Sequence, residues 1–150
     1  MSHIYVDADA CPVKAEVYRV AARHALRVTL VANASMQIPR NQDVRVQVVS
    51  GNFDAADDWI VEHVARDDIV VTADIPLAAR CLARGAAVVS PTGKPYTEDN
   101  IGDALATREL LADARAYGVT TGPPPFDKRD RSRFLQQLEQ TIQNIRRRSR

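Results

Sequence analysis

Short apolar runs alternate with longer stretches of helical periodicity along most of the chain. Each apolar run is four to six residues long and rich in valine, which is typical of β-strands. The longer stretches place apolar residues three and four positions apart, as on one face of an amphipathic helix. The pattern predicts strands at 3–7, 27–32, 44–49, 69–72 and 86–89, and helices at about 12–25, 54–64, 75–84, 98–117 and from 130 onward.

This alternation predicts an α/β fold. Parallel strands need crossover connections, and a helix between successive strands supplies them. We therefore expect three layers, in which helices cover both faces of a five-stranded, mostly parallel sheet with the strand at 3–7 near its centre. The run V-R-V-Q-V-V at 44–49 alternates valine with polar residues, which favours a position near the edge of the sheet.

A chain of 150 residues is long enough for a single domain with its own core. The segment T-T-G-P-P-P-F at 120–126 is too rich in proline and glycine for regular structure, so it predicts a hinge. We expect one domain over 1–150, in which 122–150 form the hinge and a basic C-terminal helical extension.

The formal net charge of +1 conceals an uneven distribution. Residues 1–76 contain 7 basic and 11 acidic side chains, whereas residues 77–150 contain 13 basic and 8 acidic ones. An acidic half joined to a basic tail suits an enzyme that places metal ions against a polyanion. We expect the tail to carry most of any affinity for nucleic acid, although a solvated basic helix explains the tail equally well.

Several features favour a cytoplasmic protein without a membrane partner. No apolar run approaches the roughly 20 residues that span a bilayer, and the N-terminal M-S-H-I-Y-V-D lacks the basic-then-apolar pattern of a signal peptide. Cys11 and Cys81 form neither a disulfide framework nor a metal-ligand spacing. The oligomeric state stays open.

Acidic residues gather at the positions predicted for one edge of the sheet. Ligands of open parallel sheets bind beyond the carboxyl ends of the strands. Asp7 and Asp9 follow the first strand, Asp74 follows the fourth, and Asp57 lies near the start of the preceding helix. Because like charges so close together favour a bound cation, we expect these four carboxyl groups to lie within about 10 Å of one another and to share ions.

Each carboxylate also has a structural interpretation. Asp74 and Asp9 each precede a predicted helix and are suited to cap it. Asp54 and Asp57 have the spacing of a capping box, although Asp57 shares a helical stripe with apolar residues and therefore faces the sheet. Asp58 lies off that stripe and is expected to be solvated.

Carboxylates without a histidine or cysteine partner favour Mg²⁺ or Mn²⁺ over Zn²⁺. Such ions orient water and stabilise the charge that develops in a phosphodiester displacement. The predicted metal ligands are Asp7, Asp9, Asp57 and Asp74, and the predicted catalytic residues are Asp7, Asp57 and Asp74.

Five further residues are candidates for substrate contact. Asn33 and Ser90 follow the second and fifth strands, and Lys94 lies in the segment S-P-T-G-K-P. Arg108 and Arg115 fall on the apolar stripe of the helix at 98–117, where an unpaired charge is costly. They therefore need either a phosphate or a carboxylate partner, and an ion pair with the acidic residues is the alternative to substrate contact.

The chain resembles the YaiI/YqxD family of bacterial proteins over nearly its whole length. The motifs that carry the resemblance are V-D-A-D-A-C-P (6–12), V-A-N (31–33), F-D-A-A-D (53–57), V-T-A-D-I-P-L-A (71–78), G-A-A (85–87), Y-T (96–97), T-G-P (121–123) and D-R-x-x-F (130–134). The resemblance implies a PIN-like fold, a fold that includes many metal-dependent ribonucleases. Asp7, Asp57 and the T-x-D-x-x-L aspartate Asp74 are similar to three acidic elements of that pattern. The fourth acid, beyond the fifth strand, has no counterpart here, so either Asp9 substitutes for it or the metal site is incomplete.

Three functions are compatible with these features. The first is a Mg²⁺- or Mn²⁺-dependent, nuclease-like protein that acts on RNA or another phosphodiester. The second is a phosphatase of the D-x-D type, although Cys11 stands where such enzymes usually have Thr or Val. The third is a non-catalytic module that binds nucleic acid or a partner and retains the acidic residues.

Overall fold

The computed structural model describes residues 2–51, 54–118 and 125–149, which form a six-stranded mixed sheet and five helices. The strands are β1 (His3–Asp7), β2 (Arg27–Ala32), β3 (Val44–Val48), β4 (Ile69–Val71), β5 (Ala87–Val89) and β6 (Pro95–Tyr96). The helices are α1 (Lys14–His24), α2 (Ala55–His63), α3 (Ile75–Ala83), α4 (Ile101–Ala116) and α5 (Lys128–Arg148). The α/β class is confirmed. The predicted count of five strands is wrong, because the segment after β5 turns back and adds β6.

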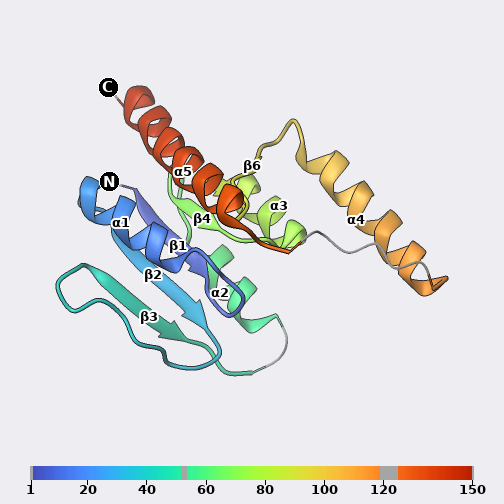
Figure 1. Ribbon diagram of the computed structural model, residues 1–150, viewed down its shortest axis with the longest axis horizontal. Coiled ribbons are helices and arrows are strands. Elements are labelled where there is room, and N and C mark those ends of the chain that lie inside the picture. The colour runs from blue at the N-terminus through green and yellow to red at the C-terminus, as the bar shows by residue number, and fades with distance from the viewer. Residues whose placement is uncertain (1, 52–53, 119–124, 150) are drawn as a thin grey trace.

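The sheet has the strand order β3-β2-β1-β4-β5-β6 (Figure 1). The first five strands are parallel, and β6 pairs with β5 in the antiparallel sense. The predicted central position of β1 and the edge position of β3 are therefore confirmed. Strands β2 and β3 lie on one side of β1, and β4, β5 and β6 lie on the other side. The strand order therefore reverses between β1 and β4, whose carboxyl ends are neighbours. Open α/β sheets bind their ligands at such a switch point.

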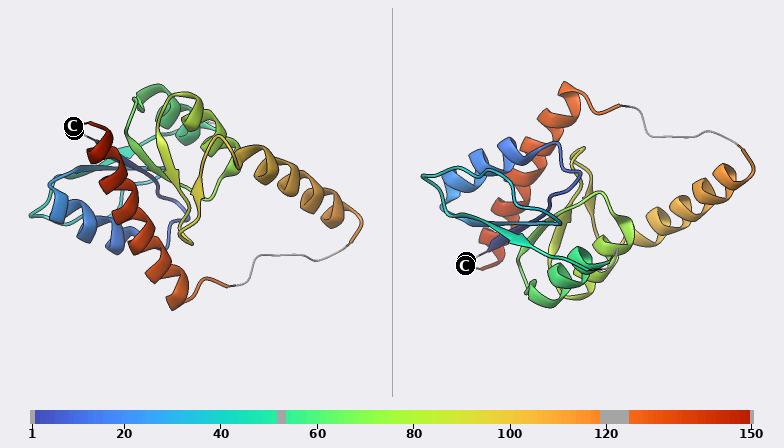
Figure 2. Two further views of the ribbon diagram at one scale, coloured as in Figure 1. Left: turned by 90° about the horizontal axis from the view of Figure 1, so that it is seen from above. Right: turned by 90° about the horizontal axis from the view of Figure 1, so that it is seen from below.

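The two faces of the sheet are covered by different helices, as Figure 2 shows from above and below. Because side chains alternate along a strand, Ile4 and Val6 of β1 pack into a core beneath α1 and α5, whereas Tyr5 packs into a second core beneath α2 and α3. The three-layer arrangement is confirmed.

Helix α5 is part of the first core. Its apolar stripe is buried against α1 and the sheet, and it consists of Phe134, Leu138, Thr141, Ile142 and Ile145. The turn between β5 and β6 passes directly under the start of α5: a Cβ atom on Gly93 would lie 2.6 Å from the carbonyl carbon of Arg133. Helix α5, predicted as a C-terminal extension, therefore contributes side chains to the core of the domain.

Helix α4 projects away from the body of the domain (Figures 1 and 2). It packs against α3, and Ala104 is its one buried residue. Leu110, in the outer half of the helix, is 68% exposed, and Tyr117, which follows its last residue, is 88% exposed. The predicted inward face for Arg108 and Arg115 is wrong, because α4 projects beyond its contact with α3 and both side chains are exposed.

Two further predictions concern the start of α1 and the hinge before α5. Helix α1 begins at Lys14, after a turn that contains Pro12, so this proline precedes the helix instead of starting it. The predicted hinge at 120–126 falls largely on residues 119–124, which lie outside the described residues. Among the described helices, none combines the length and apolar character that crossing a membrane requires.

Candidate functional site

Asp7 and Asp74 are held together at the switch point by a threonine. The Thr72 hydroxyl donates to Asp7 Oδ2 at 2.9 Å and accepts from the backbone N–H of Asp74 at 3.0 Å. Asp74 Oδ1 accepts from the backbone N–H of Leu77 at 2.9 Å, so the predicted N-cap of α3 is confirmed. One oxygen of each carboxylate is thereby fixed, while Asp7 Oδ1 and Asp74 Oδ2 accept no hydrogen bond within the described part of the chain.

Asp9, one of the predicted metal ligands, forms hydrogen bonds to the main chain after β2. Both of its carboxylate oxygens accept from the backbone N–H of Asn33, at 3.2 and 3.1 Å. This contact ties the loop after β1 to the end of β2. Asp9 does not cap α1, because the N-cap residue of that helix is Val13, which makes no side-chain capping bond. Asn33 contacts Asp9 through its backbone N–H, and Asn33 itself is exposed.

Asp57 completes the acidic cluster from α2. The predicted capping box is wrong: Asp54 stands at the N-cap position of α2, but its side chain makes no capping hydrogen bond. The half-buried Asp57 carboxylate instead lies near enough to Asp7 and Asp74 for both of their charges to raise its pKa. Asp58 points elsewhere, as predicted, and pairs with Arg80 at 2.9 Å.

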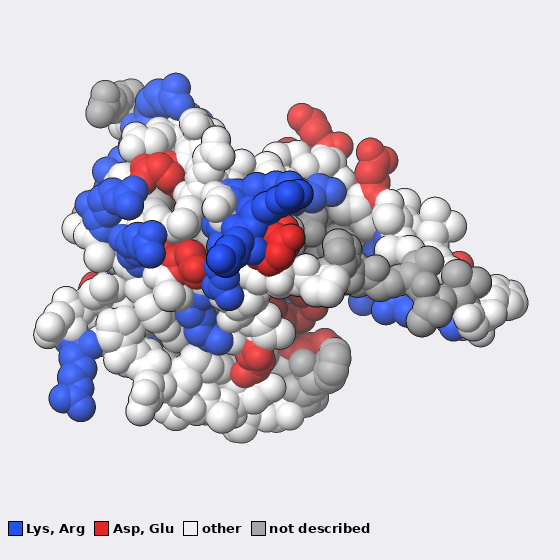
Figure 3. Space-filling view, in the orientation of Figure 1, with Lys and Arg blue, Asp and Glu red and all other residues white. Residues whose placement is uncertain are grey.

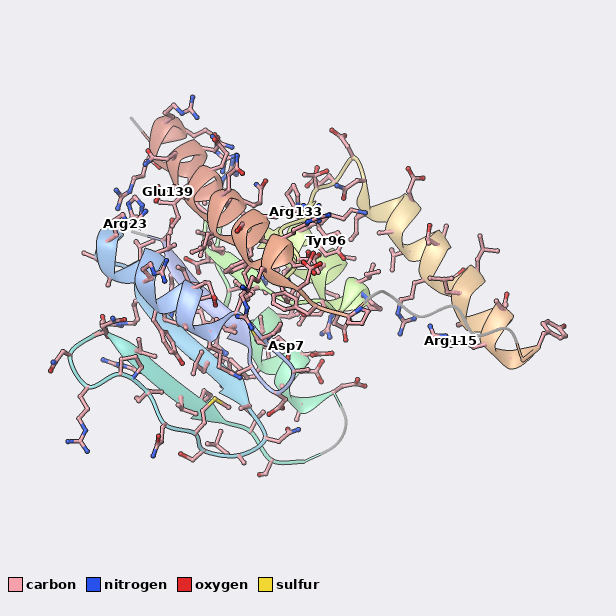
Figure 4. The ribbon with its side chains drawn as sticks, viewed as in Figure 1. Asp7, Arg23, Tyr96, Arg115, Arg133 and Glu139 are labelled. Atoms are coloured by element: carbon pink, nitrogen blue, oxygen red, sulfur yellow. The ribbon has the colours of Figure 1, made fainter. Side chains whose placement is uncertain are left out.

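Burial and the charges of neighbouring carboxylates raise the pKa values of Asp57 and Asp7. The pKa of Asp57 rises from its ordinary value of 3.8 to about 6, first because the carboxyl is desolvated and then because Asp74, Asp7 and Asp54 are negative. Desolvation also raises the pKa of Asp7, together with the charges of Asp74 and Asp9 and against the hydrogen bond from Thr72. The three carboxylates Asp7, Asp57 and Asp74, here called the acidic cluster, therefore lie close enough to repel one another (Figure 4 labels Asp7).

The predicted set of four metal ligands is not assembled. Among the described residues, no group of three or more Asp, Glu, His or Cys side chains is arranged to hold a metal ion. The donor chemistry nevertheless fits a hard divalent cation, because Mg²⁺ keeps much of its water and takes only one or two carboxylates from the protein. The charges of Asp74 and Asp9, which help to raise the pKa of Asp7, are the electrostatic feature that such a cation relieves.

A groove of about 580 Å³ opens directly beside the cluster, between α4 and the wall formed by α3 and β6. Asp74 lies in this groove together with three of the predicted substrate residues, Lys94, Arg108 and Arg115. Neither arginine forms an ion pair with an acidic side chain in the described part of the chain. The predicted alternative, an ion pair with the acidic residues, is therefore wrong, and both guanidinium groups face the groove and solvent.

Ser90 organises the turn between β5 and β6. It is buried, its hydroxyl shares a hydrogen bond with Thr92 Oγ1 at 3.0 Å, and it accepts from the backbone N–H of Lys94 at 3.0 Å. Ser90 thus has a structural position, and its turn presents Lys94.

Thr72 is the site residue that the list of sequence candidates left out. It is 1% exposed and positions both Asp7 and Asp74. The signal for it was present in V-T-A-D-I-P-L-A, but an isolated threonine at a strand end is a weak indicator. Only the register of β1 beside β4, with Val6 opposite Val71, shows that its hydroxyl meets Asp7.

The comparison with known families agrees with the sequence motifs. The family model described as "Uncharacterized BCR, YaiI/YqxD family" matches residues 5–144. This chain belongs to the YaiI/YqxD family. It is 56% identical to a UPF0178 protein of Azorhizobium caulinodans over 145 residues, which cover 96% of this chain and 91% of the relative. It is 55% identical to one of Rhodospirillum centenum over 152 residues, covering 98% and 99% of the two chains. No solved structure matches the chain.

The raised pKa of Asp57 predicts a specific pH dependence of stability without metal. The folded protein binds a proton at Asp57 below about pH 6, whereas the unfolded chain does so only below about 3.8. The folded state is therefore relatively favoured at low pH, and this contribution is lost as the pH rises through 6. Asp57→Asn should gain about 1–2 kcal/mol over wild type at pH 7.5, a value reduced for solvent screening, and nearly nothing at pH 4.

Urea unfolding in EDTA across this pH range measures the difference. Asp58→Asn is the matched control, because Asp58 is the next residue of the same helix and forms an exposed ion pair. A gain for Asp57→Asn that is the same at pH 4 and pH 7.5 would contradict a raised pKa of Asp57 in the folded protein.

Proposed function

We propose that this protein is a divalent-metal-dependent phosphodiesterase of the PIN-like kind that acts on RNA. The observation that carries the proposal is the junction of the acidic cluster with a groove lined by Lys94, Arg108 and Arg115. A polyanion needs basic contacts, and hydrolysis of its backbone needs carboxylates that hold a cation or a water molecule. The two requirements meet at Asp74, which belongs to both the cluster and the groove.

The residues of the cluster have distinct tasks in this proposal. Asp7 and Asp74 would hold Mg²⁺ or Mn²⁺ through the oxygens that the internal hydrogen bonds leave open, and the cation would stabilise the charge on the phosphoryl oxygens. Asp57, whose pKa of about 6 is near that of a general base, would accept a proton from the attacking water. Thr72 positions the first two carboxylates and contacts no substrate.

Three features support the PIN-like assignment within this proposal. An aspartate ends the central strand β1, a second lies on α2, and a third caps α3 within the T-x-D-x-x-L motif. The absence of the fourth acid is the main departure from that pattern. The extra positive charge of Lys94 at this position favours binding of the scissile strand over a second tightly held cation. Because RNA turnover is intracellular and both cysteines are free thiols, we propose that the protein acts in the cytoplasm.

An RNA-cleavage assay tests the proposal. The wild-type protein is incubated with an end-labelled RNA that contains paired and unpaired regions, with Mg²⁺, with Mn²⁺ or with EDTA. Cleavage should require the cation, and Asp74→Asn should reduce its rate about 100-fold or more, as expected when one preorganised electrostatic contact to the transition state is lost. Asparagine still caps a helix well, so α3 should be preserved.

Asp43→Asn is the control, because Asp43 lies in an exposed ion pair with Arg27, away from the cluster. Absence of cation-dependent cleavage by the wild-type protein, or full activity of Asp74→Asn, would contradict the proposal. Capture of beryllofluoride at Asp7 without RNA cleavage would instead favour the D-x-D phosphatase.

A further inference from the structure

We infer that the groove between α4 and the α3–β6 wall binds a single-stranded polynucleotide, whose phosphates contact Lys94, Arg108 and Arg115. The inference deepens the proposed function, because it names the form of the substrate and the surface that holds it. The groove is lined by Ala73, Asp74, Ile75, Lys94, Tyr96, Asn100, Asp103, Ala104, Thr107, Arg108, Leu111 and Arg115.

None of the three basic side chains of the groove forms an ion pair within residues 2–51, 54–118 and 125–149, although Asp74 and Asp103 also line the groove. Arg108 forms no ion pair in the described part of the chain, and Arg115 donates from Nε only to the carbonyl oxygen of Leu111, at 3.3 Å. The Lys94 ammonium lies 5.8 Å from the centre of the Tyr96 ring. Their charge is therefore available to a phosphate backbone, and release of counterions drives such binding.

The spacing of the arginines favours a polymer over a mononucleotide. Arg108 and Arg115 are seven residues apart on one helix, which places them about 10 Å apart along its axis. Groups this far apart contact different phosphates. Arg115 lies near the outer end of the projecting helix and Tyr96 lies at its base (Figure 4), so the contacts follow the length of α4.

The remaining lining favours a single strand over a duplex. Ile75 and Leu111 contribute apolar surface to the groove, and Tyr96, which is 9% exposed, contributes a small part of it. Unpaired bases expose flat apolar faces that stack on such side chains, whereas the bases of a duplex are already stacked on one another. Asn100 and Thr107 add polar groups that suit the edges of unpaired bases. A strand that leaves the groove at Asp74 enters the acidic cluster.

Three basic residues of α5 form ion pairs with carboxylates. Figure 3 shows blue side chains together with red ones both over α5 and on the projecting helix. Arg131 pairs with Glu16, Arg133 with Asp130, and Arg148 with Asp67. We therefore place the main nucleic-acid contact on α4 and the turn before β6, and not on the basic tail that the charge distribution favoured.

Equilibrium binding without metal tests the inference separately from catalysis. A labelled, unstructured RNA is titrated with protein in EDTA at several salt concentrations, and fluorescence anisotropy gives the affinity. The groove variant carries Lys94→Gln, Arg108→Gln and Arg115→Gln. The matched control carries Arg19→Gln, Arg40→Gln and Arg45→Gln, three exposed arginines outside the groove.

The groove variant should bind at least about 10-fold more weakly than wild type, and the slope of log affinity against log salt should fall by about 2, since each single-strand phosphate contributes roughly 0.7. The control should keep the wild-type slope, and a duplex of the same length should bind wild type more weakly. Equal losses in the groove variant and the control, or equal affinity for duplex and single strand, would overturn the inference. Groove-dependent binding without cleavage would refute the proposed enzyme and leave the inference intact, whereas cleavage with unchanged binding by the groove variant would refute the inference alone.

Discussion

Replacing Phe134 by alanine is expected to lower the free energy of unfolding by about 3–5 kcal/mol. The side chain is 0% exposed and belongs to the core that α1 and α5 share with the sheet. Its removal takes away apolar contacts and leaves a cavity that the neighbouring strands can fill only in part. Since domains of this size are stable by about 5–15 kcal/mol, the variant should be close to unfolding at physiological temperature.

Denaturant unfolding measures this loss, and Gln136→Ala is the control, because Gln136 lies on the exposed side of the same helix. A loss for Phe134→Ala as small as that of the control, within about 0.5 kcal/mol, would mean that α5 does not complete the core. The same argument predicts that removal of residues 128–150 unfolds the domain. Nucleic-acid binding by the basic residues of α5 is therefore best tested by substitution of exposed arginines and not by truncation.

Asp7→Asn is expected to stabilise the metal-free protein and to abolish its stabilisation by Mn²⁺. The pKa of Asp7 is raised by burial and by the charges of Asp74 and Asp9, so the ionised form is disfavoured in the folded protein. The neutral amide removes this repulsion and keeps the shape of the side chain. Its oxygen still accepts from the Thr72 hydroxyl, so the substitution tests charge more than packing.

A bound cation should stabilise the wild-type protein because it binds the folded state in preference to the unfolded one. At a cation concentration 100 times the dissociation constant, the gain is about 2.7 kcal/mol. For a chain of this length, that gain corresponds to a rise in melting temperature of roughly 5–10 °C.

The sequence predicted those parts of the fold that local pattern determines. Strands β1 and β2 have the predicted bounds, because apolar runs bounded by polar residues leave little freedom in their ends. The strand β6 was missed because Pro95 and Tyr96 are too few to form a pattern, and they become a strand only by pairing with β5. The exposure of α4 was missed for a related reason, since Ile101 and Leu105 give the helix an apolar stripe whether or not a partner covers it.

The acidic cluster could be predicted only in outline. The rule that ligands bind at the carboxyl ends of strands placed Asp7, Asp57 and Asp74 at one edge, and their mutual effects on pKa agree with that placement. The rule gave no information on hydrogen bonding. The hydrogen bonds of Asp9 to Asn33 and of Ser90 to Thr92 depend on loop conformations. The periodicity of the sequence contains no information on those conformations.

The acidic cluster as a cation site is the central claim, and thermal melting of the wild-type protein and Asp7→Asn, with and without Mn²⁺, tests it most directly. Asp43→Asn is melted beside them as the control. We predict that Mn²⁺ raises the melting temperature of the wild-type protein and of Asp43→Asn, and that Asp7→Asn melts higher than wild type in EDTA and does not respond to Mn²⁺. A wild-type protein that does not respond to Mn²⁺, together with an Asp7→Asn variant that melts lower in EDTA, would show that Asp7 is a structural residue and would contradict the claim.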